Sequence, residues 1–204
     1  MRGIWCTKIG MTQVFKESGV LVPVTALDVG KWIVTQIKSA ERDGYVAIQV
    51  GSVRKRYAEQ AFAADWLQRL SRYFSVVREV AVDSVGEYVV GGPVDVSQVV
   101  IAGDHVHVSG VTIGRGFQGG VKRHGFAGGR GSHGDTLGRK GGSMGFMRSR
   151  GRVIKGWRMA GHMGAEQRTV KNLQVIGTEA GRGVILIAGS VPGKTGTLLY
   201  VQKA

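Results

Sequence analysis

The chain has 204 residues, with 28 Lys and Arg against 14 Asp and Glu, which gives a formal net charge of +14. This length predicts one or two domains, and so large a positive charge predicts a polyanionic partner, either nucleic acid or an acidic membrane surface. The single cysteine, Cys6, excludes an intrachain disulfide and a zinc site made of cysteines, and it favours a cytosolic or organelle-matrix location.

A membrane is the weaker of these two partners. No apolar run reaches the roughly 18 residues that are needed to span a bilayer, and the N-terminus lacks the apolar core of a signal peptide. The positive charge also does not lie on an amphipathic helix. We therefore expect no membrane partner.

The first quarter of the chain predicts short antiparallel strands joined by tight turns. Residues 1–15 are expected to form a turn-interrupted segment that leads into a short strand. Residues 20–27 are rich in β-branched side chains, and 31–38 alternate as their hairpin partner would across the intervening turn. A third strand is expected at 45–50. This pattern is typical of an antiparallel β-barrel.

The pattern changes in residues 53–98, which we interpret as a subregion inserted into the β domain. Apolar residues at helical spacing between 57 and 74 predict one amphipathic helix packed on the barrel. The cluster Arg54-Lys55-Arg56 is either a solvated face or a second phosphate contact. The helical positions are Phe62, Trp66, Leu70 and Phe74, and short strands at 76–82 and 88–90 are expected before a break at 91–93.

Strand character returns on both sides of a long basic stretch, Ile113 to Ala165. This arrangement predicts one discontinuous β-barrel domain, made of 1–112 and 166–204, with 113–165 as an extension that projects from it. The expected strands are 99–108 before the extension and 169–176, 184–188 and 198–201 after it.

The basic stretch of 53 residues carries eleven Lys and Arg against one acid, Asp135, and 17 of the chain's 34 glycines. Its bulky apolar residues follow neither helical nor strand spacing, so we expect it to form no core of its own. A long segment of this kind is normally either functional or disordered. Arg side chains spaced between glycines, with aromatic and His residues interleaved, favour nucleic-acid binding over plain disorder.

Three short motifs suggest other chemistry but lack its context. Residues 114–119 match G-x-G-x-x-G, yet no helical pattern follows to receive a pyrophosphate. Residues 193–195 resemble the end of a P-loop, but position 188 is Ala where the motif needs Gly, so a hairpin turn is expected. His105 and His107 share a strand face without a third metal ligand nearby.

Enzymatic activity is also not expected. Ser132, His133 and Asp135 lie close together in sequence, but glycines surround them, and a catalytic triad needs rigid supports. We expect no catalytic residues, no metal, no cofactor and no small-molecule substrate.

Several strings in order along the chain resemble the bacterial or organellar type of the large-subunit ribosomal protein L3 family. They run through essentially the whole sequence, and the string from Lys155 to Gly164 is highly specific. The strings are Thr7-Lys8-Ile9-Gly10-Met11-Thr12-Gln13, residues 114–123, Ser132-His133-Gly134, Gly142-Ser143-Met144-Gly145 and Lys155-Gly156-Trp157-Arg158-Met159-Ala160-Gly161-His162-Met163-Gly164.

The resemblance implies a translation-protein-like β-barrel on the outer surface of the subunit and a loop that threads through ribosomal RNA towards the peptidyl transferase centre. It further implies direct RNA binding, a part in early assembly, neighbouring large-subunit proteins as partners, and a location in a bacterial cytoplasmic or organellar ribosome. The expected RNA-binding residues are Lys8, Arg115, Lys122, Arg123, His124, Arg130, His133, Arg139, Lys140, Arg148, Arg150, Arg152, Lys155, Trp157, Arg158 and His162. The expected loop tip is Gly142, Ser143, Met144, Gly145, Phe146, Met147, Arg148, Ser149, Arg150 and Gly151.

The loop tip departs from the family pattern at two positions. Arg148 stands where many bacterial members carry a glutamine that can be methylated, so this modification is not expected. Arg150-Gly151 replaces the usual Pro-Gly, which adds charge and removes a restraint on φ. A free-standing RNA- or DNA-binding protein is the alternative function.

Overall fold

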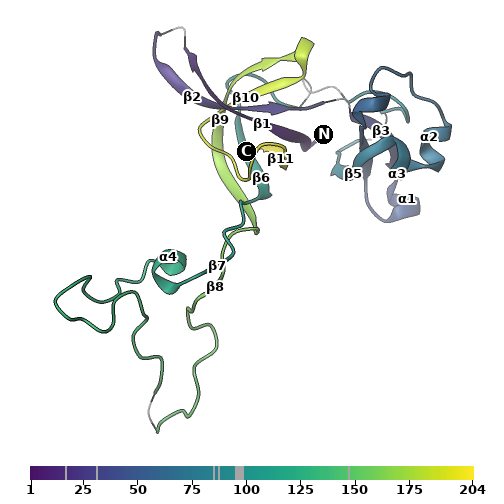
Figure 1. Cartoon of the computed structure of the whole chain (residues 1–204). Helices are drawn as coiled ribbons and strands as arrows, with labels where there is room; N and C mark the ends of the chain where they lie inside the picture. Colours follow the sequence, from purple (N-terminus) through teal and green to yellow (C-terminus); the bar gives the residue numbers. More distant parts are fainter. Residues whose placement is uncertain (17, 31, 85, 87, 95–98, 147) are drawn as a thin grey trace. The chain divides into compact units, whose positions relative to one another are not determined.

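The structure is a computed structural model that describes residues 1–204 except 17, 31, 85, 87, 95–98 and 147. The chain divides into two units. Unit 1 consists of Met1–Val111 and Gln167–Ala204, and unit 2 consists of Thr112–Glu166. Unit 1 is mostly β structure with a few short helices, whereas unit 2 has little regular structure (Figure 1).

Six strands of unit 1 pair side by side until the sheet closes on itself. The order around this ring is β1, β11, β6, β9, β10 and β2, and every neighbouring pair is antiparallel. Closure leaves no strand of the ring with a free edge. The predicted mostly β, antiparallel fold is therefore confirmed. The ring strands are Gly3–Phe15 (β1), Leu21–Asp28 (β2), His105–Val111 (β6), Gln167–Glu179 (β9), Val184–Ala188 (β10) and Leu198–Lys203 (β11).

The first strand of the ring is longer than the sequence indicated. We expected a turn to interrupt residues 1–15, but β1 runs through them without a break. The register against β2 instead shifts between Lys8 and Gly10, which marks a β-bulge. A bulge adds one residue and bends a strand without ending it. The expected turn is therefore replaced by a bulge within one continuous strand.

A second sheet has the order β3-β4-β5, with strands Trp32–Lys38, Ala47–Val53 and Phe74–Ala81. The predicted hairpin between 20–27 and 31–38 is therefore wrong, and Lys31 lies outside the described residues. Both edges of β2 are already taken by β1 and β10 in the ring, so β3 pairs with β4. The short helix α1 (Ala40–Asp43) joins β3 to β4 and ends at Gly44, whose φ is 81°.

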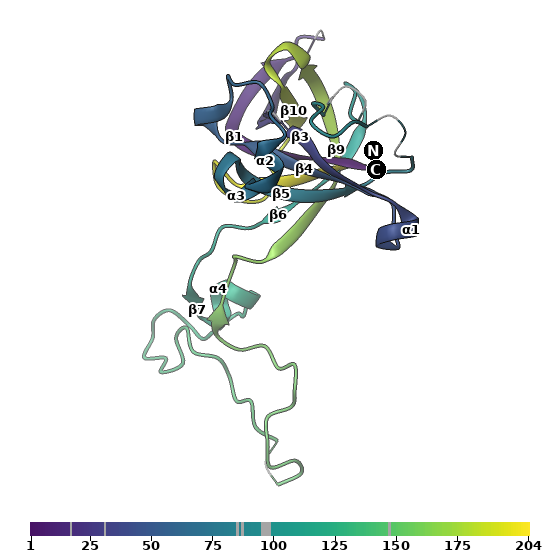
Figure 2. The ribbon, with the colours of Figure 1, turned by 90° about the vertical axis from the view of Figure 1, so that its right-hand side faces the viewer.

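The single helix predicted between 57 and 74 is replaced by shorter pieces. The 3₁₀ turn η1 (Lys55–Tyr57) is followed by α2 (Asp65–Gln68) and α3 (Leu70–Tyr73), which adjoin β5 (Figure 1, Figure 2). The helix breaks at Arg69, where φ is −132° and ψ is 57°. The helical spacing is still partly meaningful, because Trp66 is buried.

The expected strand at 88–90 is also wrong, since those residues are irregular. The chain after them nevertheless lies along β3. The amide of Gly91 donates to the carbonyl of Val34 at 2.8 Å, and that of Val94 donates to the carbonyl of Trp32 at 3.0 Å. Pro93 forms an isolated bridge with Ile33. The predicted break at 91–93 thus covers an edge of the second sheet.

Two further expectations, on the start of β6 and on the segment after β10, differ from the structure. Strand β6 begins at His105, later than the predicted 99–108, because Ile101 and Asp104 form a turn in which the Asp104 carboxylate accepts the Ile101 amide at 3.1 Å. The hairpin predicted at 193–195 is wrong, since the segment joins β10 to β11 and these strands are not neighbours in the ring.

The two sheets of unit 1 share one apolar core. Ile4, Leu27 and Ile185 from the ring lie in the same buried cluster as Val34 and Ile48 from the second sheet. Cys6 is also completely buried. Burial raises the pKa of its thiol well above the ordinary value, and the negative charge of Asp28 adds to this effect.

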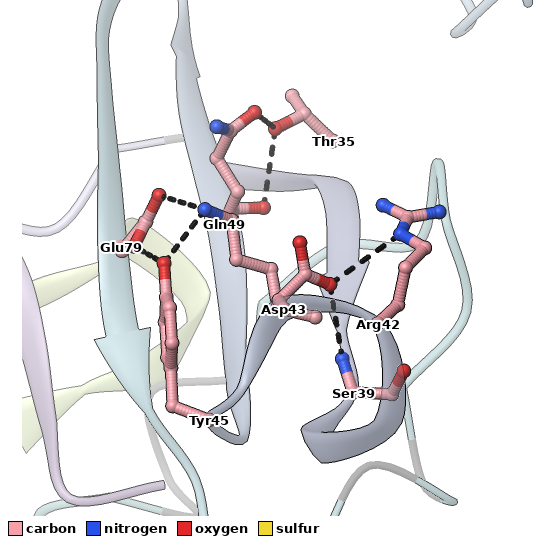
Figure 3. Close-up of polar contacts among 8 residues, drawn as sticks. Thr35, Ser39, Arg42, Asp43, Tyr45, Gln49 and Glu79 are labelled. Atoms are coloured by element: carbon pink, nitrogen blue, oxygen red, sulfur yellow. Dashed lines mark hydrogen bonds and ion pairs between the residues drawn. The ribbon is translucent and has the colours of Figure 1, made fainter.

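A cluster of polar side chains connects the two outer strands of the second sheet, β3 and β5. Lys38 of β3 forms an ion pair with Glu79 of β5 at 2.7 Å and donates to the hydroxyl of Tyr45 at 2.7 Å. The same hydroxyl donates to Glu79 at 2.8 Å, and Figure 3 shows the Tyr45 and Glu79 side chains meeting beside Gln49. These contacts raise the pKa of Lys38 and lower that of Glu79, chiefly through their mutual hydrogen bond.

Candidate nucleic-acid interface

The two arms of unit 2 are paired where they begin and end. The amide of Thr112 donates to the carbonyl of Glu166 at 3.0 Å, and that of Arg115 donates to the carbonyl of Met163 at 2.8 Å. Two short strands, β7 (Phe117–Gln118) and β8 (Gly161–His162), continue this pairing. Gly164 has a φ of 75°, and a Cβ there would collide with the Ile113 carbonyl. The glycine therefore permits the close approach of the arms.

A five-residue helix, α4 (Gly120–His124), follows β7. It ends at Gly125, whose φ is 72° and whose amide donates to the carbonyls of Gly120 and Val121. Two of its basic side chains reach the other arm: Arg123 Nη1 donates to the Met159 carbonyl at 2.7 Å, and His124 Nε2 lies 2.9 Å from the same oxygen. These two predicted RNA-binding residues therefore also join the arms of unit 2.

The only acid of the basic stretch organises the backbone around it. The Asp135 carboxylate accepts the amides of Arg130 and Leu137, the latter at 2.8 Å. The amide of Gly129 donates to the carbonyl of Gly138 at 2.7 Å and closes the same loop. A carboxylate that holds two backbone amides in a turn has a structural role.

The segment from Gly141 to Arg158 has no helix or strand in its described part, and two aromatic side chains face each other within it. The Phe146 and Trp157 rings lie 5.9 Å apart in an edge-to-face arrangement. Ser149 donates from its hydroxyl to the Phe146 carbonyl at 2.7 Å. Met147, which the sequence placed in the loop tip, lies outside the described residues.

An open cavity of about 340 Å³ borders the same segment. Phe126 and Trp157 contribute aromatic side chains to its wall, and Arg158 contributes a cation. Phe126 was not among the residues predicted to bind RNA. The sequence could have pointed to Phe126, because it is one of the aromatic residues that lie between the basic residues of this stretch.

The predicted RNA-binding residues of unit 2 lie at its surface. Their side chains are exposed, apart from Arg123 and His124, which are half-buried. None of the described residues of unit 2 is buried, and within that described part no cation forms an ion pair with a carboxylate. The arrangement leaves many guanidinium and ammonium groups free to meet phosphates. The exposed residues are Arg115, Lys122, Arg130, His133, Arg139, Lys140, Arg148, Arg150, Arg152, Lys155, Trp157, Arg158 and His162.

Lys8 differs from the other predicted residues because it belongs to unit 1. Its ammonium donates to the carbonyls of Val191 and Gly193, at 3.1 and 2.9 Å. The side chain is half-buried in β1. Lys8 therefore fastens the segment between β10 and β11 to the ring, and one ammonium proton remains for another acceptor.

The histidine pair on β6 is not assembled into a metal site. His107 Nδ1 accepts the amide of Asn172 at 3.1 Å. Across the residues that the structure covers, no three His, Cys, Asp or Glu side chains are grouped to hold a metal ion. The helices in this covered part are all too short or too polar to cross a membrane.

Comparison with known proteins agrees with the resemblance noted above. Residues 75–190 match the family described as Ribosomal protein L3. The chain is 43% identical over its full length to the large ribosomal subunit protein uL3 of Desulforapulum autotrophicum, with 99% of that protein covered. It is 41% identical to the uL3 proteins of Geotalea daltonii and Trichormus variabilis, with 98% and 99% of this chain and 96% of each relative covered. The chain therefore belongs to the ribosomal protein L3 family, a family of structural proteins and not of enzymes.

Proposed function

We propose that this protein is a structural constituent of the large ribosomal subunit and binds the RNA of that subunit directly. The observation that carries the proposal is unit 2, in which no described residue is buried while exposed cations gather without carboxylate partners. Such a segment lacks an apolar core of its own, and RNA would supply both the countercharge and the packing surface.

The finer parts of this proposal follow the family resemblance. Unit 1 would be a translation-protein-like barrel at the subunit surface, with neighbouring ribosomal proteins as partners. Unit 2 would extend through the RNA towards the peptidyl transferase centre, with its tip at 142–151, and the protein would act early in assembly. The relatives are large ribosomal subunit proteins uL3 of bacteria, which supports a ribosome of the bacterial cytoplasm as the location.

The residues proposed to contact RNA fall into two classes. Exposed cations such as Arg148, Arg150 and Arg152 would meet phosphate oxygens, since an Arg fork matches two of them at once. Trp157, which is 44% exposed, would stack on an unpaired base. Arg123 and His124 would instead shape the extension while adding charge to it.

Crosslinking with mass spectrometry on gradient-purified large subunits tests the proposal. RNA adducts on peptides between Arg115 and Arg158, joined to RNA near the catalytic centre, are the expected result. Absence of the protein from the large-subunit fraction would contradict it and would favour a free-standing RNA- or DNA-binding protein. In that case duplex DNA should compete with structured ribosomal RNA at equal charge.

A further inference from the structure

The positive charge of unit 1 is concentrated in one short segment. Residues 54–78 carry six Lys and Arg against two acids, a net charge of +4. Outside residues 113–165 the chain has 17 Lys and Arg against 13 Asp and Glu, which is also a net charge of +4. Without residues 54–78 and 113–165, the chain therefore has a net charge of zero. The positive charge of residues 54–78 is not needed for the β fold.

An aromatic cluster holds this segment in place. The ring of buried Trp66 stacks on that of Tyr73 at 5.1 Å with an angle of 3° between the planes. Phe62 and Phe74 meet Trp66 edge to face at 5.8 and 6.0 Å. Tyr57 contacts the Tyr73 ring at 4.9 Å. The short helices therefore have a rigid base even though neither is long enough to be stable alone.

Arg54 fastens the same segment to the second sheet. Its Nε donates to the carbonyl of Phe74 at 3.2 Å, and its Nη2 donates to that of Ser71 at 3.0 Å. Arg54 is therefore a positioning residue, with much of its donor capacity used within unit 1. The other cations around it are left for different partners.

Four cations on this base lack acidic partners. Lys55, Arg56, Arg69 and Arg72 are exposed, and no carboxylate among the described residues forms an ion pair with any of them. We name these four residues the 55–72 cationic face.

Other cations of unit 1 have acidic partners. Arg2 pairs with Asp83 at 2.9 Å, and Lys203 pairs with Asp104 at 2.9 Å. Lys38 and Arg182 pair with Glu79 and Glu179 at 2.7 and 3.7 Å. Lys16, Lys171 and Lys194 also lack a carboxylate partner among the described residues, but they are dispersed along the sequence, whereas the four cations of the face all lie between residues 55 and 72.

Two guanidinium groups of the face are oriented by aromatic rings. Arg56 and Arg72 lie over the rings of Tyr57 and Tyr73, each 5.6 Å from the ring centre. A hydrogen bond from Arg72, together with the positive charge of Arg56, lowers the pKa of Tyr57. Oriented guanidinium groups lose less conformational entropy when they bind an anion.

The face borders an open groove of about 650 Å³. Lys55, Arg56 and the hydroxyl-bearing Ser52 and Ser75 line it, and these groups suit an anionic ligand. Asp28 also lines the groove, but its carboxylate already accepts the Gly30 amide at 2.8 Å.

From the unpaired cations, the aromatic cluster that supports them and the groove beside them, we propose that the 55–72 cationic face is a second RNA-binding surface. It binds the phosphate backbone independently of unit 2. This inference rests on the proposed function and adds an anchoring surface on unit 1. Phosphate is favoured over an acidic protein because the exposed donors are guanidinium and ammonium groups, with aromatic rings beside them to contact ribose and bases.

The test is the salt dependence of binding to a transcribed fragment of large-subunit RNA, measured on the full chain. The variant is Lys55→Gln, Arg56→Gln, Arg69→Gln and Arg72→Gln together. Since each phosphate contact contributes roughly 0.7–0.9 to the slope of log K against log salt, the slope should fall by roughly three. A control of equal charge change replaces four exposed cations elsewhere in unit 1 by Gln, namely Lys16, Lys171 and Lys194, which have no carboxylate partner among the described residues, and Arg182, which pairs with Glu179.

The outcomes separate the inference from the proposed function. A slope that falls no more than in the control overturns the second surface, while normal RNA binding by the wild-type chain upholds the proposed function. Normal RNA binding by the variant combined with failure to join the subunit would assign the face to a protein partner and also overturn it. If the wild-type chain shows no salt-dependent RNA binding, the proposed function itself fails. A triple variant that keeps Arg72 guards against loss of the aromatic cluster, and its slope should fall by roughly two.

Discussion

At the scale of single residues, some charged side chains of this chain form hydrogen bonds that hold the backbone in place. Asp135, the lone acid of the basic stretch, holds a turn through the amides of Arg130 and Leu137. Lys8 donates to two backbone carbonyls. The sequence singled out Asp135 as the lone acid, and the resemblance gave Lys8 as an RNA contact. The sequence could not assign the partners of Lys8, because they lie 183 and 185 residues further along the chain.

Gly164 provides the first test at this scale. Ala at this position would need a φ near 75° and would bring its Cβ into the Ile113 carbonyl, so Gly164→Ala should separate the paired arms of unit 2. Amide hydrogen exchange should become faster at Arg115 and Met163, whose pairing closes the arms. Gly119→Ala is the control, because Gly119 has a φ of −71° and open space around it. Equal exchange in the two variants would show that close approach of the arms is not needed.

Lys8 provides the second test. Lys8→Met removes a charged donor from two carbonyls of the β10–β11 segment, and such hydrogen bonds contribute about 1.5–3 kcal/mol when they are well shielded. Because Lys8 is half-buried, we expect a loss of about 1 kcal/mol in the free energy of unfolding, measured by denaturant titration. Lys171→Met, at an exposed position, should change it little. If Lys8→Met left stability intact but weakened RNA binding, Lys8 would act mainly as an RNA contact.

At the scale of elements, the sequence predicted strands better than their partners. The ranges 184–188 and 198–201 lie within β10 and β11, because alternation of apolar side chains is a local signal. The pairing of 20–27 with 31–38 failed because closure of the ring occupies both edges of β2, which is a non-local constraint. The single helix expected at 57–74 is wrong, because Arg69 leaves the helical conformation and divides the segment into two short helices that pack around Trp66.

The second sheet provides a pH-dependent test. Its Lys38 hydrogen bond holds the pKa of Glu79 below the ordinary value, so the contribution of Glu79 to stability is fully present above that ordinary value. The contribution is lost as the pH falls through the lowered pKa, because the carboxylate is then protonated in the folded state. Glu79→Gln should therefore lower the Tm slightly near neutral pH, and the two proteins should converge in acid. Glu79 is about two-fifths exposed, so water weakens the effect.

Glu59→Gln is the matched control for this measurement, since Glu59 is also an exposed carboxylate of unit 1. It should leave the Tm nearly unchanged at every pH. A constant difference between wild type and Glu79→Gln down to strongly acidic pH would show that the carboxylate charge is not the source of the stability.

At the scale of the whole molecule, the apolar core and the main proposed RNA-binding residues belong to different units. Unit 1 has a buried apolar core, whereas unit 2 has no buried residue in its described part. The glycine content and charge of 113–165 led us to expect an extension without a core of its own, because a segment without apolar periodicity cannot bury enough surface to offset its conformational entropy. The sequence left open whether the cluster Arg54-Lys55-Arg56 contacts phosphate, and it did not connect Arg72 with this cluster, since Arg56 and Arg72 meet at Tyr57 only in the folded chain.

This division predicts that substitutions in unit 2 affect binding without affecting the fold of unit 1. Arg150→Ala with Arg152→Ala removes two exposed cations that have no carboxylate partner in the described chain. The slope of log K against log salt for large-subunit RNA should fall by roughly 1.5, and incorporation into subunits should weaken. The thermal melt should keep its cooperativity and midpoint, because the apolar core lies entirely in unit 1. Lys171→Ala with Lys194→Ala removes the same charge from unit 1 and should change the slope less. A lost or broadened melt in the unit 2 variant would mean that folding and binding are not separable in this chain.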